Sequence, residues 1–190
     1  MTTPSARRST APDDVGDREW LATELYRVSH LTGEFLLRSG ATATEYFDKY
    51  QFESRPALLR QIATAMVPLI PTGTEVLAGL ELGGVPIAIA MSLQTELPVA
   101  LVRKKAKTYG TCRVAEGPDL AGRRVTVIED VVTSGGQIVL STQDLREAGA
   151  TVEDALCVID REAGGRAALK EVGVHLTPLY QADDLRTASS

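Results

Sequence analysis

Two adjacent carboxylates and a glycine-rich turn stand together at residues 129–137 (EDVVTSGGQ), directly after a run of apolar residues. Glu129 and Asp130 offer oxygens that accept hydrogen bonds from a sugar diol. The turn at 133–137 opens a predicted helix, and the free backbone amides at a helix N-terminus bind phosphate. Together the two features predict a site for a ribose 5-phosphate. A helix-capping turn with acids drawn to the helix dipole is the simpler alternative, and it explains each half only singly.

Three further predicted strands end in residues that could bind anions. Gly83 and Gly84 precede a predicted helix and present free amides. Arg103 begins a cationic stretch, 103–111 (RKKAKTYGT), which fits a substrate with several negative charges, although a solvated surface loop is the usual reading of such a run. Arg161 follows another strand, and a guanidinium grips a planar anion at two points.

The stretch 125–137 (VTVIEDVVTSGGQ) resembles the phosphoribosyl pyrophosphate signature of the type I phosphoribosyltransferases. The resemblance implies that Glu129 and Asp130 hold the ribose hydroxyls, that the turn wraps the 5-phosphate, and that the two glycines at 83–84 form a pyrophosphate loop. The residues expected to bind phosphoribosyl pyrophosphate are Gly83, Gly84, Arg103, Lys104, Lys107, Tyr109, Glu129, Asp130, Val131, Val132, Thr133, Ser134, Gly135, Gly136 and Gln137.

The cationic stretch is similar to the mobile catalytic loop of one branch of this superfamily, the orotate phosphoribosyltransferases, whose pattern is Arg-Lys-x-x-Lys-x-His-Gly. Arg103, Lys104 and Lys107 match that pattern, and Tyr109 stands where the family commonly has His. Glycines at 110 and 117 supply the hinges that a closing lid needs.

The N-terminal part supplies another match. Residues 33–40 (GEFLLRSG) resemble the segment Phe-x-Leu-x-Ser-Gly of the same enzymes, with Arg38 before Ser-Gly, but 41–44 lacks the usual Ser-Pro. The aromatic pair that follows is expected to pack against a pyrimidine, the alternative being core packing. The residues expected to contact orotate are Arg38, Tyr46, Phe47, Thr133 and Arg161.

The resemblance implies transfer of a phosphoribosyl group from phosphoribosyl pyrophosphate to orotate, giving orotidine 5′-monophosphate and pyrophosphate in pyrimidine biosynthesis. Lys107, Asp130 and Glu129 are the residues expected to act in catalysis. Mg²⁺ is the expected cofactor, held mainly through substrate oxygens and water, with no metal ligand on the protein. The resemblance also implies a homodimer in which the cationic loop of one subunit closes over its partner's site.

The elements that must position these residues follow from the alternation of short apolar strands with helices between residues 76 and 179. This alternation predicts an α/β fold with a parallel central sheet flanked by helices, because such strands are buried on both faces. We expect strands at 76–80, 99–102, 125–128, 156–159 and 174–179, and N-terminal helices from residue 20 and from Pro56. Residues 1–19 are expected to be a disordered tail, and 20–190 a type I phosphoribosyltransferase domain with a small hood from 20–50 and the C-terminal segment.

Composition limits the partners. The chain has 190 residues with 20 basic and 25 acidic side chains, a net charge of −5, which argues against a general nucleic-acid-binding coat. No apolar run approaches the ~20 residues of a membrane helix. The two cysteines, at 112 and 157, lie far apart and indicate neither a disulfide framework nor a zinc knuckle. We therefore expect a cytoplasmic protein without nucleic acid or membrane partners.

Two alternatives stay open at this point. One is a phosphoribosyltransferase for another base, a neutral purine or uracil. Arg38 and Arg161 argue against it, because an unpaired cation facing a neutral base is desolvated without compensation. The other is a non-catalytic regulator that senses phosphoribosyl pyrophosphate. Such regulators carry an added DNA-binding domain, whereas about 19 polar residues precede Trp20 here.

Overall fold

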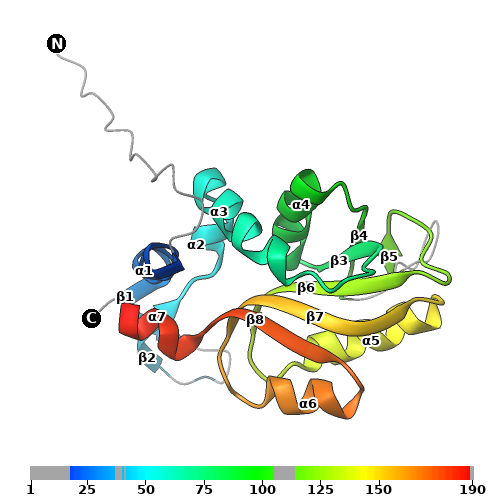
Figure 1. The fold of residues 1–190 in the computed structure, drawn as a ribbon. Helices are drawn as coiled ribbons and strands as arrows, with labels where there is room; N and C mark the ends of the chain where they lie inside the picture. The colour runs from blue at the N-terminus through cyan, green and yellow to red at the C-terminus, as the bar shows by residue number, and fades with distance from the viewer. Residues whose placement is uncertain (1–17, 37–39, 41, 105–113, 189–190) are drawn as a thin grey trace.

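The computed structural model describes residues 18–36, 40, 42–104 and 114–188. They form a six-stranded sheet with the strand order β5-β4-β3-β6-β7-β8 and a separate two-stranded hairpin, β1-β2 (Figure 1). The elements are α1 (Arg18–Ser29), β1 (His30–Leu36), β2 (Thr42–Phe47), α2 (Tyr50–Glu53), α3 (Pro56–Met66), the 3₁₀ helix η1 (Val67–Leu69), β3 (Val76–Leu80), α4 (Gly84–Thr95), β4 (Val99–Val102), β5 (Ala115–Glu116), β6 (Arg124–Val132), α5 (Gly136–Glu147), β7 (Thr151–Asp160), α6 (Gly165–Glu171), β8 (His175–Gln181) and α7 (Ala182–Ala188).

The sheet confirms the predicted α/β architecture. β3, β4, β6, β7 and β8 pair in parallel, and only the short β5 runs antiparallel to its neighbour. Helices α3 and α4 cover one face, and α5 and α6 cover the other (Figure 1). Each face has its own apolar core, because successive side chains of a strand point to opposite sides. In β3, for example, Leu77 packs into one core, whereas Val76 and Ala78 pack into the other.

The central strands are longer than expected. The sequence predicts strands at 125–128 and 156–159, but β6 extends to Val132 and β7 begins at Thr151. The reason is that backbone pairing continues past the apolar runs, with Val131 opposite Ile159. Glu129 and Asp130 therefore lie within β6 rather than after its end.

The hood is a helical layer with the hairpin attached to it. α1 begins at Arg18, inside the range 1–19 that was expected to be a tail. Two contacts with β8 hold this end of the helix: the Tyr180 hydroxyl donates to the Arg18 carbonyl over 2.8 Å, and the Arg18 guanidinium lies over the Tyr180 ring. α7, which the sequence analysis missed, packs on α1, where the Thr23 hydroxyl donates to the carbonyl of Ala188 over 2.8 Å. β1 begins at His30, directly after α1 ends at Ser29.

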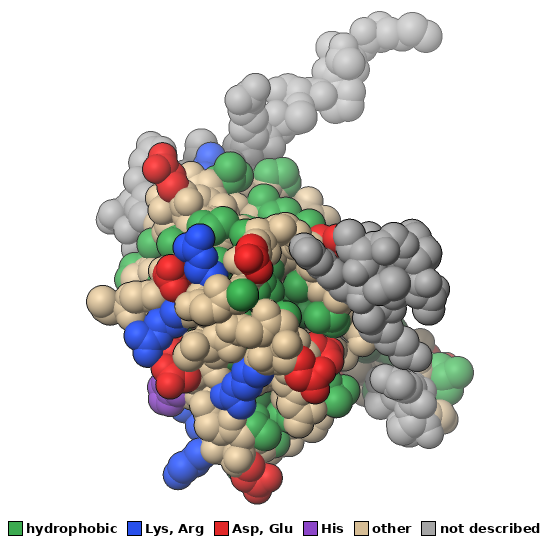
Figure 2. All heavy atoms as spheres, turned by 90° about the vertical axis from the view of Figure 1, so that its right-hand side faces the viewer, with side chains coloured by type: hydrophobic (Ala, Val, Ile, Leu, Met, Phe, Trp, Pro, Cys, Tyr) green, Lys and Arg blue, Asp and Glu red, His purple; other side chains and the backbone are tan. Residues whose placement is uncertain are grey.

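The surface is mixed in charge. Figure 2 shows Lys and Arg side chains interspersed with Asp and Glu on the face it presents, without a broad patch of one sign among the described residues. None of the helices in the described ranges is both long and apolar enough to cross a membrane.

The N-terminus of α4 presses directly onto the sheet, and glycines make this contact possible. A Cβ on Gly84 would lie 2.2 Å from the carbonyl oxygen of Ile128 in β6. A Cβ on Gly79 in β3 would lie 2.9 Å from the carbonyl oxygen of Gly84. Both atoms belong to backbone and cannot swing away, so a side chain at either position forces the helix off the sheet.

We expect Gly84→Ala to lower the free energy of unfolding by at least about 1–3 kcal/mol, the usual cost of overpacking a well-filled interior. Gly136→Ala is the matched control, since a Cβ there meets nothing closer than a Ser134 side-chain atom at 3.8 Å. Chemical denaturation of both variants measures the difference. Equal stability of the two variants would contradict the close packing of α4.

Candidate active site

The first pocket lies where β6 meets α5. Its volume is about 280 Å³, and its lining consists of Glu129, Val131, Val132, Thr133, Ser134, Gly135, Gly136, Gln137 and Ile138. The structure thus brings the predicted phosphate turn together around one hollow. The N-cap residue of α5 is Gly135, with φ of +75° and no side-chain cap. The amides of the first helical turn lack intrahelical partners. Because no side chain of the turn caps them, these amides are open to an anion.

The turn is held by contact with the start of α6. A Cβ on Gly165 would lie 2.6 Å from the Thr133 carbonyl oxygen, and one on Gly135 would lie 3.0 Å from the Gly165 carbonyl oxygen. The positive φ of Gly135 also favours glycine at that position. The anion site is therefore shaped by backbone packed on backbone.

A cluster of carboxyls adjoins this pocket. Asp130 is fully buried, and Glu129 is 8% exposed. The Asp130 amide donates to Glu129 Oε1 over 3.0 Å, which holds the Glu129 carboxyl beside its neighbour. Burial and the neighbouring Asp130 charge raise the pKa of Glu129 well above its ordinary value. Although burial alone would raise the pKa of Asp130, hydrogen bonds from Glu129, Glu53 and Lys49 lower it instead. The adjacent acids thus carry one negative charge rather than two.

Two members of this cluster were missed by the sequence analysis. Lys49 Nζ lies 2.6 Å from Asp130 Oδ2, and Glu53 Oε1 lies beside the same carboxyl, since a Cβ on Gly83 would contact both oxygens. Both come from the short segment between the hairpin and α3. The available signal was a lysine and a glutamate four residues apart, directly after the aromatic pair.

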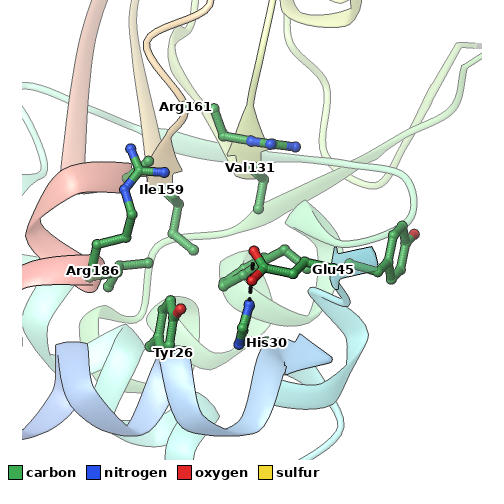
Figure 3. A pocket seen from close by; sticks show the side chains of 11 residues that line it. Tyr26, His30, Glu45, Val131, Ile159, Arg161 and Arg186 are labelled. Atoms are coloured by element: carbon green, nitrogen blue, oxygen red, sulfur yellow. Dashed lines mark ion pairs between the residues drawn. The ribbon is translucent and has the colours of Figure 1, made fainter. Parts of the chain in front are cut away.

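A second pocket opens between the hood and the sheet, with a volume of about 200 Å³ (Figure 3). The structure brings the predicted Tyr46, Phe47 and Arg161 together there. The other lining residues are Tyr26, His30, Glu45, Val131, Ile159, Ala182, Leu185 and Arg186.

Both rims of this pocket are fixed by polar contacts. On the hood side, His30 Nε2 lies 3.4 Å from Glu45 Oε2 and the His30 ring stacks on Tyr26 (Figure 3). On the sheet side, the amide of Arg161 donates to the Val132 carbonyl over 2.9 Å. The buried Asp160 accepts a hydrogen bond from the amide of Glu162 over 2.9 Å, which holds the turn that carries the guanidinium.

Some predicted site residues are not brought to either pocket. Arg103 faces Glu116, with 3.6 Å between Nε and Oε1, and the amide of Lys104 donates to Glu81 Oε1 over 2.6 Å. Gly83 lies against the acidic cluster, where a Cβ would stand 1.6 Å from Asp130 Oδ2. Thr133 lines the first pocket but is not among the described residues that line the second. Arg38, Lys107 and Tyr109 lie outside the described residues.

Comparison with known proteins gives a consistent result. Residues 50–176 match the family described as the phosphoribosyl transferase domain. An orotate phosphoribosyltransferase of Nocardioides sp. is 54% identical over 168 residues, covering 88% of this chain and 94% of the relative. One from Methanopyrus kandleri is 41% identical, covering 90% and 93% of the two chains.

The solved structures agree with these relatives. The orotate phosphoribosyltransferase of Mycobacterium tuberculosis H37Rv, solved with Fe(III) dicitrate, superposes with a TM-score of 0.80 at 30% identity, covering 90% of this chain and 99% of the other. A second structure of the Mycobacterium tuberculosis H37Rv enzyme, in complex with 5-phospho-α-D-ribosyl 1-diphosphate, gives a TM-score of 0.76 at 25% identity, covering 90% and 99% of the two chains. With the phosphate turn, the acidic pair and the arginine-rimmed pocket in place, the chain belongs to the phosphoribosyl transferase domain family and, within it, to the orotate phosphoribosyltransferases.

Proposed function

We propose that this enzyme transfers the 5-phosphoribosyl group of phosphoribosyl pyrophosphate to orotate, releasing pyrophosphate. The observation that carries the proposal is the junction of the two pockets: Val131 lines both of them. A nucleotide product needs a phosphate site and a base site about one ribose apart. The shared wall and the adjoining acidic cluster support that arrangement.

In the proposed reaction the bond to the anomeric carbon breaks through an oxocarbenium-like state, as in other glycosyl transfers. No side chain has to act as nucleophile, so positioning and charge supply the catalysis. The negative charge of Asp130 stabilises the cationic sugar, and Glu129, which lines the first pocket, accepts hydrogen bonds from the sugar hydroxyls. Tyr46 and Phe47 flank the base, and Arg161 pairs with its carboxylate. By resemblance, Lys107 neutralises the departing pyrophosphate.

The acidic cluster is a poor direct ligand set for Mg²⁺, since Lys49 already pairs with Asp130 and the raised pKa of Glu129 favours its neutral form. We therefore assign Mg²⁺ to oxygens of the substrate and to water, the arrangement this ion commonly adopts with phosphates. When bound, it neutralises charge on the diphosphate.

A cytoplasmic homodimer with shared active sites completes the proposal. Exposed apolar residues on one face of α4 support the dimer: Ile89 is 42% exposed and Leu93, one turn further along the helix, is 83% exposed. Exposed apolar groups gathered on one surface are typical of a protein interface.

A transferase for another base is the second candidate, and Arg161 at the rim of the base pocket favours orotate over it. The adenine phosphoribosyltransferase of Leishmania donovani, at 16% identity and a TM-score of 0.67, shares the fold alone. A regulator that only senses phosphoribosyl pyrophosphate would not turn over any base.

We expect the purified protein, given phosphoribosyl pyrophosphate and Mg²⁺, to release pyrophosphate with orotate and not with uracil, adenine or hypoxanthine. Of these four bases only orotate carries a carboxylate, and its charge offsets the free-energy cost of desolvating the Arg161 guanidinium. A coupled pyrophosphate assay across the four bases measures this. Turnover of a neutral base at a comparable rate would favour the other transferase, and no turnover at all would favour the regulator.

Arg161→Ala should raise the KM for orotate by roughly 10- to 150-fold, because a charge-assisted hydrogen bond contributes ~1.5–3 kcal/mol. The KM for phosphoribosyl pyrophosphate should change much less. Arg123→Ala, which removes an exposed guanidinium paired with Glu75, is the control. Equal increases for both substrates would assign Arg161 to phosphate binding or to structure instead.

The shared site predicts complementation between Lys107→Ala and Asp130→Asn. If the loop acts on the neighbouring subunit, a hybrid dimer has one doubly damaged site and one intact site. Full exchange makes about half of the dimers hybrid, so activity should recover to about a quarter of wild type for independent sites. Activity is measured after subunit exchange has been verified by mass spectrometry. Absence of recovery would place Lys107 within its own subunit's site.

A further inference from the structure

Lys49 and Glu53 are ionisable residues in the acidic cluster for which the proposed reaction has so far given no role. Lys49 stands at the N-cap of α2 and Glu53 in its last position. Both side chains approach the Asp130 carboxyl from the hood, whereas Asp130 itself belongs to β6 of the sheet. We propose that they are positioning residues: together they hold Asp130 as a single anion in one orientation beneath the sugar. This inference rests on the proposed function.

The turn that carries Lys49 is itself fixed. The Asp48 amide donates to the Ser29 carbonyl over 2.8 Å, and Asp48 Oδ1 accepts from the Tyr50 amide over 3.1 Å. The Lys49 ammonium lies 2.6 Å from Asp130 Oδ2 and 5.5 Å from the centre of the Tyr50 ring. The Lys49 side chain remains one-third exposed, so it covers Asp130 at the boundary between the cluster and solvent.

Glu53 is confined more tightly. It is 8% exposed, and a Cβ on Gly83 would stand 2.5 Å from its Oε1 and 1.6 Å from Asp130 Oδ2. The two carboxyls therefore share a space from which even a methyl group is excluded. Two carboxyls placed this closely in a buried site favour a state in which one of them is protonated.

The electrostatics agree with that geometry. Burial, followed by the hydrogen bond to Asp130, raises the pKa of Glu53 to about 8. Lys49 lowers this pKa, whereas the charges of Asp130 and Asp48 raise it. Burial opposes the charge on Lys49, but the hydrogen bond and charge of Asp130 outweigh burial and raise the Lys49 pKa. At neutral pH Glu53 is thus the neutral donor, Asp130 the anion and Lys49 its counter-ion.

The positioning role predicts how activity divides among variants. Glu53→Ala removes a hydrogen bond to a charged group and should lower kcat by roughly 10- to 150-fold, with little change in the KM for orotate. Glu53→Gln keeps a neutral donor and should restore most of that loss. Lys49→Met should also lower kcat, because it removes the counter-ion of Asp130. Lys49→Arg keeps the positive charge and should retain folding and most activity, and it replaces the Met variant in the comparison should that variant not fold. Lys170→Met and Glu171→Ala change exposed residues of α6 and are the matched controls.

The pH dependence separates positioning from a merely structural role. As pH rises through about 8, Glu53 ionises and repels Asp130, so wild-type kcat should fall there, whereas Glu53→Gln should show no fall at that pH. The protonated Glu53 also contributes stability that is complete below pH 4.5 and is lost as pH rises to about 8. The difference in thermal midpoint between Glu53→Gln and wild type should therefore widen between about pH 5 and 8 and stay constant above.

Either of two results would overturn the inference: kcat of Glu53→Ala equal to that of Glu171→Ala, or the same pH profiles for Glu53→Gln and wild type. The thermal titration needs no substrate. If wild type failed to use orotate while the midpoints diverged as expected, the proposed function would fail and the Lys49–Asp130–Glu53 arrangement would stand.

Discussion

The ion pair between the buried Asp130 and the partly exposed Lys49 is the interaction on which the rest of the site depends. Three carboxyls and one ammonium meet at this point, and a low-dielectric interior does not tolerate three adjacent negative charges. The cluster resolves the conflict by protonation: Glu53 and Glu129 favour their neutral forms, and Asp130 keeps its charge beside Lys49. One defined anion is what an oxocarbenium-like transition state requires nearby.

The same ion pair joins the two halves of the molecule. Asp130 belongs to the central strand of the sheet, whereas Lys49 and Glu53 belong to the segment that follows the hood hairpin. The second pocket lies between those halves, with Tyr46 and Phe47 from the hood and Arg161 from the sheet. The ion pair therefore joins the two parts of the molecule that form this pocket. Breaking one partner of such a pair leaves an uncompensated buried charge, typically at a cost of about 3–5 kcal/mol.

Glycines supply the second constraint, because several parts of the site consist of backbone in direct contact. Gly84 lets α4 start against β6, Gly83 leaves room for two carboxyls, and Gly165 lets the phosphate turn rest on α6. Each position excludes a Cβ for a steric reason that is independent of any ligand. The glycines at 83 and 84, predicted as a pyrophosphate loop, thus have a packing role that the structure makes explicit.

Local patterns made the sheet and the phosphate turn predictable from the sequence. Apolar runs located the strand centres, and small residues before a helix located the turn that surrounds the first pocket, since both depend on residues close together in the chain. The ends of β6 and β7 were missed because pairing across the sheet extends them through polar positions. Lys49 and Glu53 escaped notice because their partner is some 80 residues away and α2 is only four residues long. The sequence predicts that Arg103 faces an anionic substrate, but in the structure Arg103 faces Glu116 of β5. This contact could not be predicted, because β5 has only two residues and so shows no recognisable periodicity in the sequence.

The most direct test of this account is a ¹³C NMR titration of the side-chain carboxyls of Asp130 and Glu53 in the substrate-free protein between pH 5 and 9. Variants Asp130→Asn and Glu53→Gln would assign the two resonances. The account predicts that Asp130 keeps the shift of an ionised carboxylate throughout, and that Glu53 stays protonated until it titrates at about pH 8. A Glu53 carboxyl already ionised at pH 5, or an Asp130 that titrates within this range, would contradict it.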